Sequence, residues 1–195
     1  MLPDYKIPYG NHKLDKKDID KVNKILTSKY LTQGPQVDIF EKKINEFVGA
    51  KFSVATNSAT SALHIACLAL NLKKGDYLWT VPNSFVASAN CGRYCGADVD
   101  FVDIDPKSWN LSINNLEKKL KEAKKINKLP KIIVTVHFGG QPTIQEKIYR
   151  LKKIYKFNII EDASHSIGAS RKEILVGNCK WSDITVFSFH PVKII

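Results

Sequence analysis

Two charged residues in this sequence stand where apolar segments end, and both could take part in chemistry. Lys193 follows the apolar run DITVFSF within SFHPVK, and Asp162 ends the apolar run FNIIED. A lysine amine forms imines as a nucleophile only when it is partly desolvated and gives up its proton readily. A carboxylate placed like that of Asp162 can bind a metal, act as a general base, pair with a buried cation or cap a helix. Taken singly, Lys193 is more readily a surface charge, and a helix cap explains Asp162 equally well.

A phosphate site is indicated by Ser58–Ser61, where small hydroxyl-bearing residues follow an apolar run and open a helix. Free backbone N–H groups, the positive end of the helix dipole and the hydroxyls together suit one phosphate group. The segment lacks the glycine patterns GxxxxGK and GxGxxG of nucleotide-binding loops. Read alone, it is explained more simply as an N-cap.

The combination of these segments points to one cofactor more strongly than any member does. Pyridoxal phosphate needs a phosphate site, a stacking ring, a carboxylate for its pyridine nitrogen and a lysine for its reactive carbon. The chain offers Ser58–Ser61, Phe85 in PNSFVAS, Asp162 and Lys193, in that order. Phe85 read alone is a core residue, since a buried ring is the commoner use of phenylalanine. Several independent coincidences would be needed to produce the set by chance.

The elements that must position these residues follow from two alternating periods of hydrophobicity. Apolar residues at helical spacing predict helices over residues 15–29, 37–48, 58–70, 84–95, 113–125 and 144–155. Continuous Val/Ile/Phe-rich runs predict strands over residues 52–57, 78–82, 98–105, 131–138, 157–163 and 183–189. Apolar strands separated by helices are typical of a mostly parallel sheet with helices on both faces. Ligands bind such sheets beyond the carboxyl ends of the strands, where we expect residues 57–61, 82–85, 137–141, 162–165 and 188–193.

The composition narrows the class of protein. The formal charge of +11 comes almost wholly from lysine, because Arg93, Arg150 and Arg171 are the only arginines. Base readout and bidentate phosphate binding favour arginine, so a solvated lysine-rich surface is a better interpretation than nucleic-acid binding. No apolar run is long enough to cross a membrane and no apolar leader begins the chain, which predicts a cytoplasmic protein. The four cysteines lack metal-site spacing and are expected to be reduced thiols, so no metal is expected.

Several segments together resemble the DegT-like sugar-nucleotide aminotransferases, namely LTQGP, NSATSALHIACLAL, SFVASANCGRYCGADVDFVDID, IIEDASHSIG and SDITVFSFHPVKII. The resemblance covers essentially the whole chain. It is strongest to the branch that aminates a UDP-linked 4-keto-6-deoxy-N-acetyl hexose on the route to pseudaminic acid. It implies an enzyme that uses pyridoxal 5'-phosphate, takes its amino group from L-glutamate and works as a homodimer in the cytoplasm.

This resemblance implies a role for each matching residue. Lys193 carries the cofactor covalently, and Asp162 pairs with the pyridinium nitrogen. The other cofactor contacts that it implies are the phosphate ligands Thr60, Ser61 and Ser188, the stacking ring of Phe85, and His165 beside the phenolic oxygen. Thr32 and Gln33 resemble a loop on the substrate side. The stretch HFGGQPTIQEKIYRL follows the family pattern loosely and receives no role.

The resemblance also implies a fold and leaves rivals open. We expect the α/β large domain of a type-I pyridoxal-phosphate transferase in residues 1–195, incomplete at its C-terminus and without the small C-terminal domain. One further strand would lie between the strands at 52–57 and 183–189, so residues 1–195 alone are expected to be inactive. One rival is a relative that dehydrates its sugar, which would place histidine where this chain has Lys193. The others are an aminotransferase for another nucleotide-linked keto sugar and a silent regulatory protein with the same fold.

Overall fold

Strands and helices alternate along most of the chain, as the hydrophobic pattern predicts. The structure is a computed structural model that describes residues 12–193. Its helices are α1 (Lys16–Leu26), α2 (Pro35–Val48), α3 (Ala59–Ala69), α4 (Ala87–Tyr94), α5 (Ile113–Lys125), α6 (Gln145–Tyr155) and the short 3₁₀ helix η1 (Phe138–Gly140). Its strands are β1 (Tyr77–Thr80), β2 (Asp98–Phe101), β3 (Ile132–Val136), β4 (Asn158–Asp162), β5 (Ser170–Arg171), β6 (Ile174–Leu175) and β7 (Ile184–Val186).

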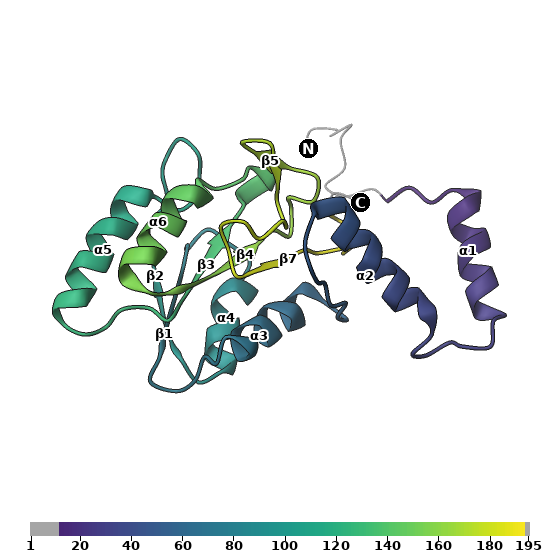
Figure 1. The fold of residues 1–195 in the computed structure, drawn as a ribbon, viewed down its shortest axis with the longest axis horizontal. Coiled ribbons are helices and arrows are strands. Elements are labelled where there is room, and N and C mark those ends of the chain that lie inside the picture. Colours follow the sequence, from purple (N-terminus) through teal and green to yellow (C-terminus); the bar gives the residue numbers. More distant parts are fainter. Residues whose placement is uncertain (1–11, 194–195) are drawn as a thin grey trace, which may run out of the picture.

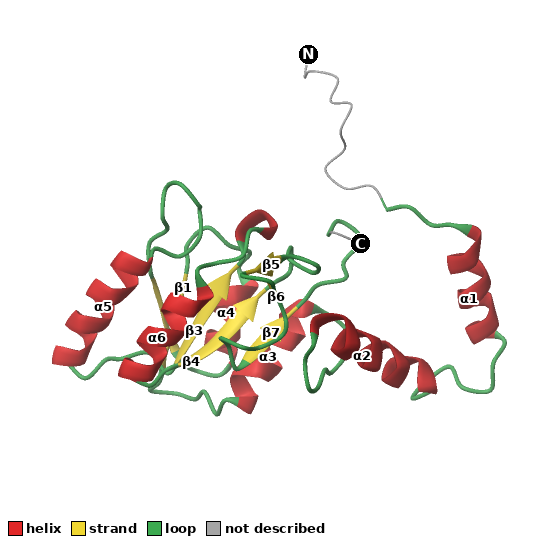
Figure 2. Ribbon diagram, turned by 45° about the horizontal axis from the view of Figure 1, so that its top comes forward, coloured by secondary structure: helices red, strands yellow, loops and turns green. Residues whose placement is uncertain are grey.

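One parallel sheet organises the domain, with the strand order β2-β1-β3-β4-β7. β3 and β4 pair along their whole lengths, ending with Val136 opposite Asp162. β7 continues the sheet beyond β4, with Val186 opposite Asp162. Because every strand of this sheet runs in the same direction, the carboxyl ends share one edge (Figure 2). The predicted parallel sheet is thus confirmed.

Helices cover both faces of this sheet (Figure 1). On one face, α3 and α4 bury Leu63, Cys67 and Cys91 against the strands. On the other face, α5 and α6 bury Leu116 and Ile148, among others. Burying one such leucine or isoleucine stabilises a fold by about 1.5–3 kcal/mol. The two cores therefore fix the strands, and with them the edge where the candidate residues lie.

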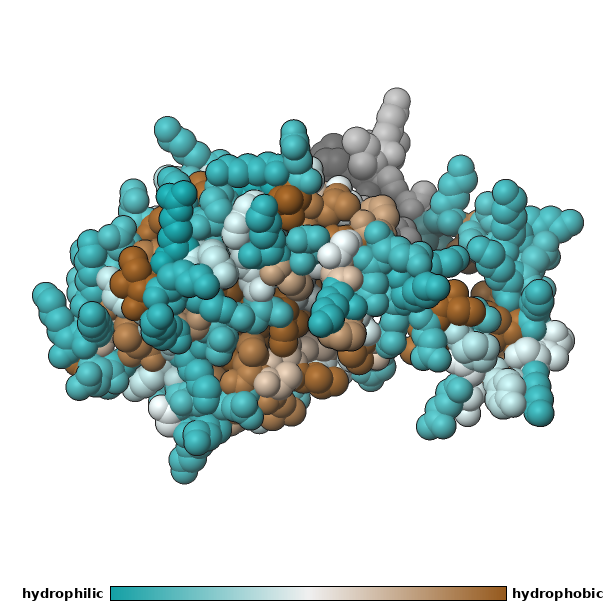
Figure 3. Space-filling view, viewed as in Figure 1, coloured by the Kyte–Doolittle hydropathy of each residue, from teal (hydrophilic) through white to brown (hydrophobic). Residues whose placement is uncertain are grey.

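α1 and α2 extend beside the sheet rather than over it (Figures 1 and 2). The side chain of Asp15 accepts a hydrogen bond from the Asp18 N–H at 3.0 Å, and the side chain of Asp18 accepts one from the Asp15 N–H at 3.0 Å. This reciprocal pair is a capping box, which fixes the start of α1. No residue of α1 is buried, and Ile19, Val22 and Leu26 are each more than half exposed. Figure 3 shows apolar side chains at the surface between α1 and α2.

The predicted strand over residues 52–57 is wrong. This segment is irregular, and Phe52 and Val54 are each 76 % exposed. A strand needs a neighbour for its backbone groups, and none of the strands in residues 12–193 pairs with it. Its polar groups bond to α2 instead, since the Ala55 N–H donates to Glu41 Oε1 at 2.7 Å.

Smaller differences concern element ends and one hairpin. Residues 84–86 precede α4 rather than belonging to it, and residues 102–105 lie beyond the end of β2. The antiparallel pair β5–β6 has only two residues in each strand, too few for a readable hydrophobic period. Between residues 12 and 193, no helix has both the length and the hydropathy needed to cross a membrane.

Candidate active site

Asp162 is the most strongly constrained of the candidate residues. It ends β4 and is 5 % exposed. The Ser88 hydroxyl donates to Asp162 Oδ2 at 2.6 Å, and the Ser164 hydroxyl donates to Asp162 Oδ1 at 2.6 Å. The Ser164 N–H also donates to Oδ1, at 3.3 Å. An ionised carboxylate accepts such bonds on both oxygens, so the site is built to hold a buried acceptor in one orientation.

The Ser84 hydroxyl connects Ser88, and through it Asp162, to the loop that carries Phe85. Ser88 lies in α4 and is fully buried, and its oxygen is 2.8 Å from the Ser84 oxygen. Ser84 immediately precedes Phe85, which is 72 % exposed. Since its ring is not used by the core, Phe85 presents a free aromatic face. The interpretation of Phe85 as an ordinary core residue is therefore wrong.

Lys193 and His165 meet at the carboxyl edge of the sheet. Lys193 Nζ is 2.8 Å from His165 Nε2, although 28 positions separate them in the chain. Burial lowers the pKa of His165, the charge of Lys193 lowers it further, and the charge of Asp162 opposes both effects. The imidazole is consequently neutral over a wider pH range than an ordinary histidine, and its Nε2 can accept a hydrogen bond from the lysine amine.

The serine-rich start of α3 forms an N-cap of its own. Ser58 Oγ accepts from the Ser61 N–H at 3.1 Å and lies 3.1 Å from Ser61 Oγ. Thr60 and Ser61 are both half-buried in the first turn. Helix α3 packs beside β7 in the same hydrophobic core, and Ser188 follows β7. The first turn of α3, where helix N–H groups lack partners within the helix, therefore belongs to the helix that packs beside β7. Ser188 and Lys193 follow β7 in the chain.

Thr32 and Gln33 are not brought to the other candidates. Both are exposed in the loop between α1 and α2, and this loop lies on the far side of α2 from the sheet in Figures 1 and 2. Gln33 adopts a left-handed backbone conformation with φ of 51°.

Sequence reasoning missed the two serines that hold Asp162 and a buried polar cluster behind it. Side chains alternate along a strand, so Glu161 points to the face of β4 opposite Asp162. Glu161 Oε2 lies 2.9 Å from His137 Nε2, and His137 Nδ1 accepts from the Thr143 N–H at 2.9 Å. Because Nδ1 is an acceptor, Nε2 carries the proton and donates it to Glu161. Both His137 and Glu161 are buried, at 2 % and 6 % exposed.

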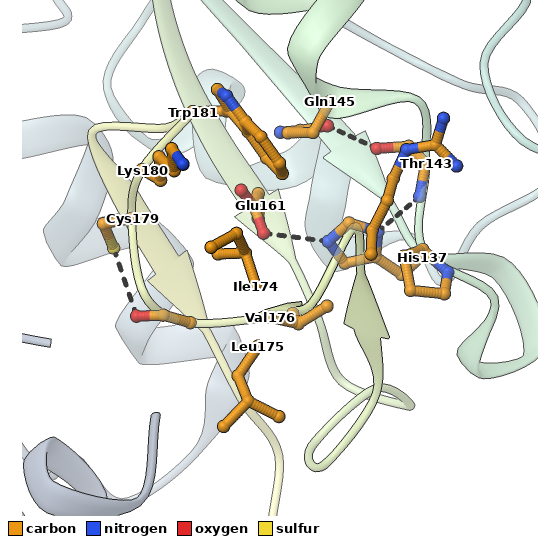
Figure 4. A pocket seen from close by; sticks show the side chains of 13 residues that line it. His137, Thr143, Gln145, Glu161, Ile174, Leu175, Val176, Cys179, Lys180 and Trp181 are labelled. Carbon is orange, nitrogen blue, oxygen red and sulfur yellow. Dashed lines mark hydrogen bonds and ion pairs between the residues drawn. The ribbon is translucent and has the colours of Figure 1, made fainter. Parts of the chain in front are cut away.

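This cluster lines a small pocket of about 20 Å³ under the β5–β6 hairpin (Figure 4). Trp181, Cys179 and the apolar residues of the hairpin complete its wall. Neither Asp162 nor Lys193 lines it. The cavity therefore belongs to the packing behind the sheet edge, and the candidate chemistry lies on the other side of β4.

Comparison with known proteins decides the family. The profile of the DegT/DnrJ/EryC1/StrS aminotransferase family matches residues 12–195. The chain belongs to this family. A relative from Campylobacter jejuni subsp. jejuni serotype O:23/36 (strain 81-176), named UDP-4-amino-4,6-dideoxy-N-acetyl-beta-L-altrosamine transaminase, is 39 % identical over 189 residues, which cover 96 % of this chain and 48 % of that protein.

Solved structures of similar proteins share the fold. Helicobacter pylori PseC, described as an aminotransferase involved in the biosynthesis of pseudoaminic acid, is 35 % identical with a TM-score of 0.84, over 95 % of this chain and 48 % of that one. The ntda protein from Bacillus subtilis, solved with bound cofactor pmp, is 30 % identical with a TM-score of 0.79, over 90 % of this chain and 38 % of that one. The present chain spans about half the length of the curated DegT relatives that it matches.

Proposed function

We propose that this DegT-family protein is an aminotransferase that moves an amino group from L-glutamate to C4 of a UDP-linked 4-keto-6-deoxy-N-acetyl hexose. Its cofactor is pyridoxal 5'-phosphate, in line with the family and with the ntda structure, whose bound cofactor pmp is the amino form of the same cofactor. The observation that carries the proposal is the convergence of Asp162, His165 and Lys193 at one edge of the sheet. A buried carboxylate and a lysine amine are two of the groups that this cofactor requires, and the imidazole of His165 lies against that amine.

The residues present fit the cofactor. Asp162 is buried and held by two serine hydroxyls, so it is pre-oriented to pair with a pyridinium nitrogen. Thr60, Ser61 and Ser188 would hold the phosphate, where the N-terminus of α3 adds free N–H groups and a positive dipole. The exposed ring of Phe85 would stack on the pyridine. Lys193 would hold the cofactor covalently, with His165 beside the phenolic oxygen.

The mechanism follows from what these side chains can do. When bound, pyridoxal 5'-phosphate supplies an electron sink that stabilises negative charge on the carbon next to the amino group. Asp162 would hold a proton at the ring nitrogen, because a buried carboxylate favours a positively charged partner. Once the incoming amino donor has displaced it, the Lys193 amine would take a proton from the α-carbon of the donor and deliver it to the carbon that had carried the lysine, acting as general base and then general acid. Neutral His165 accepts a hydrogen bond from that amine and so limits its orientations.

The substrate class rests on the relatives. The Campylobacter jejuni transaminase is named for a UDP-linked amino sugar, and PseC is described by the pseudoaminic-acid route. Aminotransfer to another nucleotide-linked keto sugar is the second candidate, because the same site residues serve either acceptor. We also assign residues 1–195 to the N-terminal segment and the cofactor-binding large domain of a cytoplasmic homodimer. The exposed apolar stripe on α1 is consistent with a subunit contact.

Two measurements test the proposal. Borohydride reduction of the full-length protein purified with pyridoxal 5'-phosphate, followed by peptide mapping, should place the adduct on Lys193. An adduct on another lysine, or none, would overturn the assignment. Acceptor assays should then show turnover of UDP-linked 4-keto sugars well above that of pyruvate and oxaloacetate. A clear preference for the keto acids would instead make this an amino-acid transaminase.

A further inference from the structure

Two aromatic side chains stand exposed next to each other at the carboxyl edge of the sheet. The rings of Trp109 and Phe138 are 6.1 Å apart between centroids and only 17° from parallel. Trp109 is 55 % exposed and Phe138 is 39 % exposed. Trp109 follows β2 and Phe138 follows β3, so the pair joins two loops of the edge where ligands of such sheets bind. A stacked pair with this much free surface is not part of a core.

The loops that carry this aromatic pair are held by hydrogen bonds from two asparagine side chains. The side chain of Asn110, 4 % exposed, donates to the Gln141 carbonyl at 3.0 Å and accepts from the Phe138 N–H at 2.9 Å. The Asn83 amide donates to the Trp109 carbonyl at 2.8 Å. Trp109 itself is held with φ of 60°, in a backbone region that is costly for a bulky residue. The aromatic pair is therefore preorganised rather than a chance arrangement of loose side chains.

Polar groups surround this pair in an open groove of about 370 Å³. Its other lining residues are Lys107, Ser108, Gly139 and Gln141. A flat ring stacked on Trp109 would find hydroxyl and amide groups at its edge and one lysine ammonium nearby. These are the contacts that a nucleobase and its phosphates require, since bases stack on aromatic side chains and phosphates pair with lysine.

The position of the groove also suits one end of an extended substrate. Neighbouring strands in a sheet lie about 4.8 Å apart. β3 and β7 are separated by β4 alone, so Phe138 is on the order of 10 Å along the edge from the strand that leads to Lys193. A sugar whose C4 reaches the Lys193 amine would extend its diphosphate and base about this far.

We infer that the Trp109–Phe138 groove binds the base of the nucleotide-linked sugar substrate, with Trp109 as the stacking surface and Lys107 beside the phosphates. This inference rests on the proposed function for its substrate class and adds the residues that recognise the nucleotide. It also explains why a strained backbone holds a tryptophan in solvent.

UMP, UDP and uridine are the probes for this groove. Of the three tryptophans, Trp79 is buried and Trp181 half-buried, so Trp109 dominates quenching by a stacked base. The Trp109→Ala variant should lose roughly 5- to 100-fold in UDP affinity by calorimetry, as expected for one lost base–aromatic stack. Trp109→Phe should keep most of the affinity while losing the fluorescence quenching. Lys107→Ala should weaken UDP and leave uridine unchanged.

A matched control and three outcomes decide between explanations. Tyr94→Ala removes another exposed aromatic, paired edge-on with His64 at the end of α4, and should leave UDP affinity unchanged. Unchanged UDP affinity in Trp109→Ala, or no UDP binding by the unsubstituted protein, would refute the inference. Loss of a dimer in sedimentation by Trp109→Ala, with UDP affinity intact, would make the pair a contact between copies and also refute it. The Lys193 adduct is measured separately, so UDP binding without an adduct would sink the proposed function and leave the groove standing.

Discussion

At the scale of single residues, the site depends on how firmly Asp162 is held. Its carboxylate is buried, and both oxygens accept serine hydroxyls at 2.6 Å. A buried charge without donors is costly, whereas one with several short bonds is fixed in direction. Asp162→Asn keeps the volume and removes the charge. We expect turnover to fall by about 100-fold or more, as for removal of a preorganised electrostatic partner, while cofactor affinity changes little. Half-reaction rates near those of the unsubstituted protein would remove Asp162 from the mechanism.

Ser88 positions the Asp162 carboxylate, and substitution of this serine tests that role. Ser88→Ala deletes the donor to Asp162 Oδ2 and should lower the free energy of unfolding by about 1.5–3 kcal/mol, the usual worth of a hydrogen bond to a charged group. Ser84→Ala is the matched control, because it removes a hydroxyl 2.8 Å from Ser88 without touching Asp162. Urea denaturation measures stability, and the absorbance spectrum of the bound cofactor reports the state of its ring nitrogen. A purely structural serine would change the first and leave the second unaltered.

His165 gives the site a pH dependence with a definite sign. Its pKa lies below the ordinary histidine value of about 6.5, chiefly because it is buried and next because Lys193 is charged. The unfolded chain therefore binds the proton more readily than the folded one, and the contribution of His165 to stability is full above about pH 6.5. It is lost as the pH falls below that value toward the folded pKa. His165→Gln should flatten this part of the stability curve, measured by denaturant unfolding between about pH 7 and pH 5. A variant curve with the same slope would assign the effect to another group.

At the scale of elements, the β5–β6 hairpin is docked on α6 by one arginine. Arg171 donates to both oxygens of Glu146, at 2.8 and 2.9 Å, and these bonds hold the pKa of Glu146 at about 2. The stability that this pair contributes is present above about pH 4.5, the ordinary value for glutamate, and is lost as the pH falls toward 2. Arg171→Lys keeps the charge and loses the bidentate geometry. We expect faster amide hydrogen exchange across residues 170–175 in this variant. Lys172→Ala, at a residue also near Glu146, should change exchange far less, because it makes a single exposed contact.

The helices and strands also indicate how much of the fold and of the candidate site could be predicted from the sequence. Helical and strand periods located the helices and the parallel sheet, because elements buried against the sheet carry a strong hydrophobic pattern. Residues 52–57 carry that pattern too, but a pattern cannot supply the paired neighbour that a strand needs. For the site, strand ends pointed to Asp162 and Lys193. The approach of Ser88 to Asp162 depends on how α4 packs against β4, and the exposure of Trp109 depends on a buried asparagine between two loops. Both depend on tertiary packing, which the spacing of hydrophobic residues along the chain does not encode.

At the scale of the whole molecule, the formal charge of +11 sets a field in which an anionic substrate must move. The charge is spread over lysines rather than gathered in arginine clusters, so it acts on encounter more than on specific recognition. We expect the association rate of UDP, measured by stopped-flow fluorescence, to fall by about 10-fold or more as salt is raised from low ionic strength to about 0.15 M. The dissociation rate should change less, because stacking is not screened by salt, whereas the Lys107–phosphate contact is. Uridine is the matched ligand, since it has the same base without the phosphates and should associate at a rate that salt leaves nearly constant. An equal loss of rate for uridine and UDP would show that salt acts on the protein itself rather than on steering.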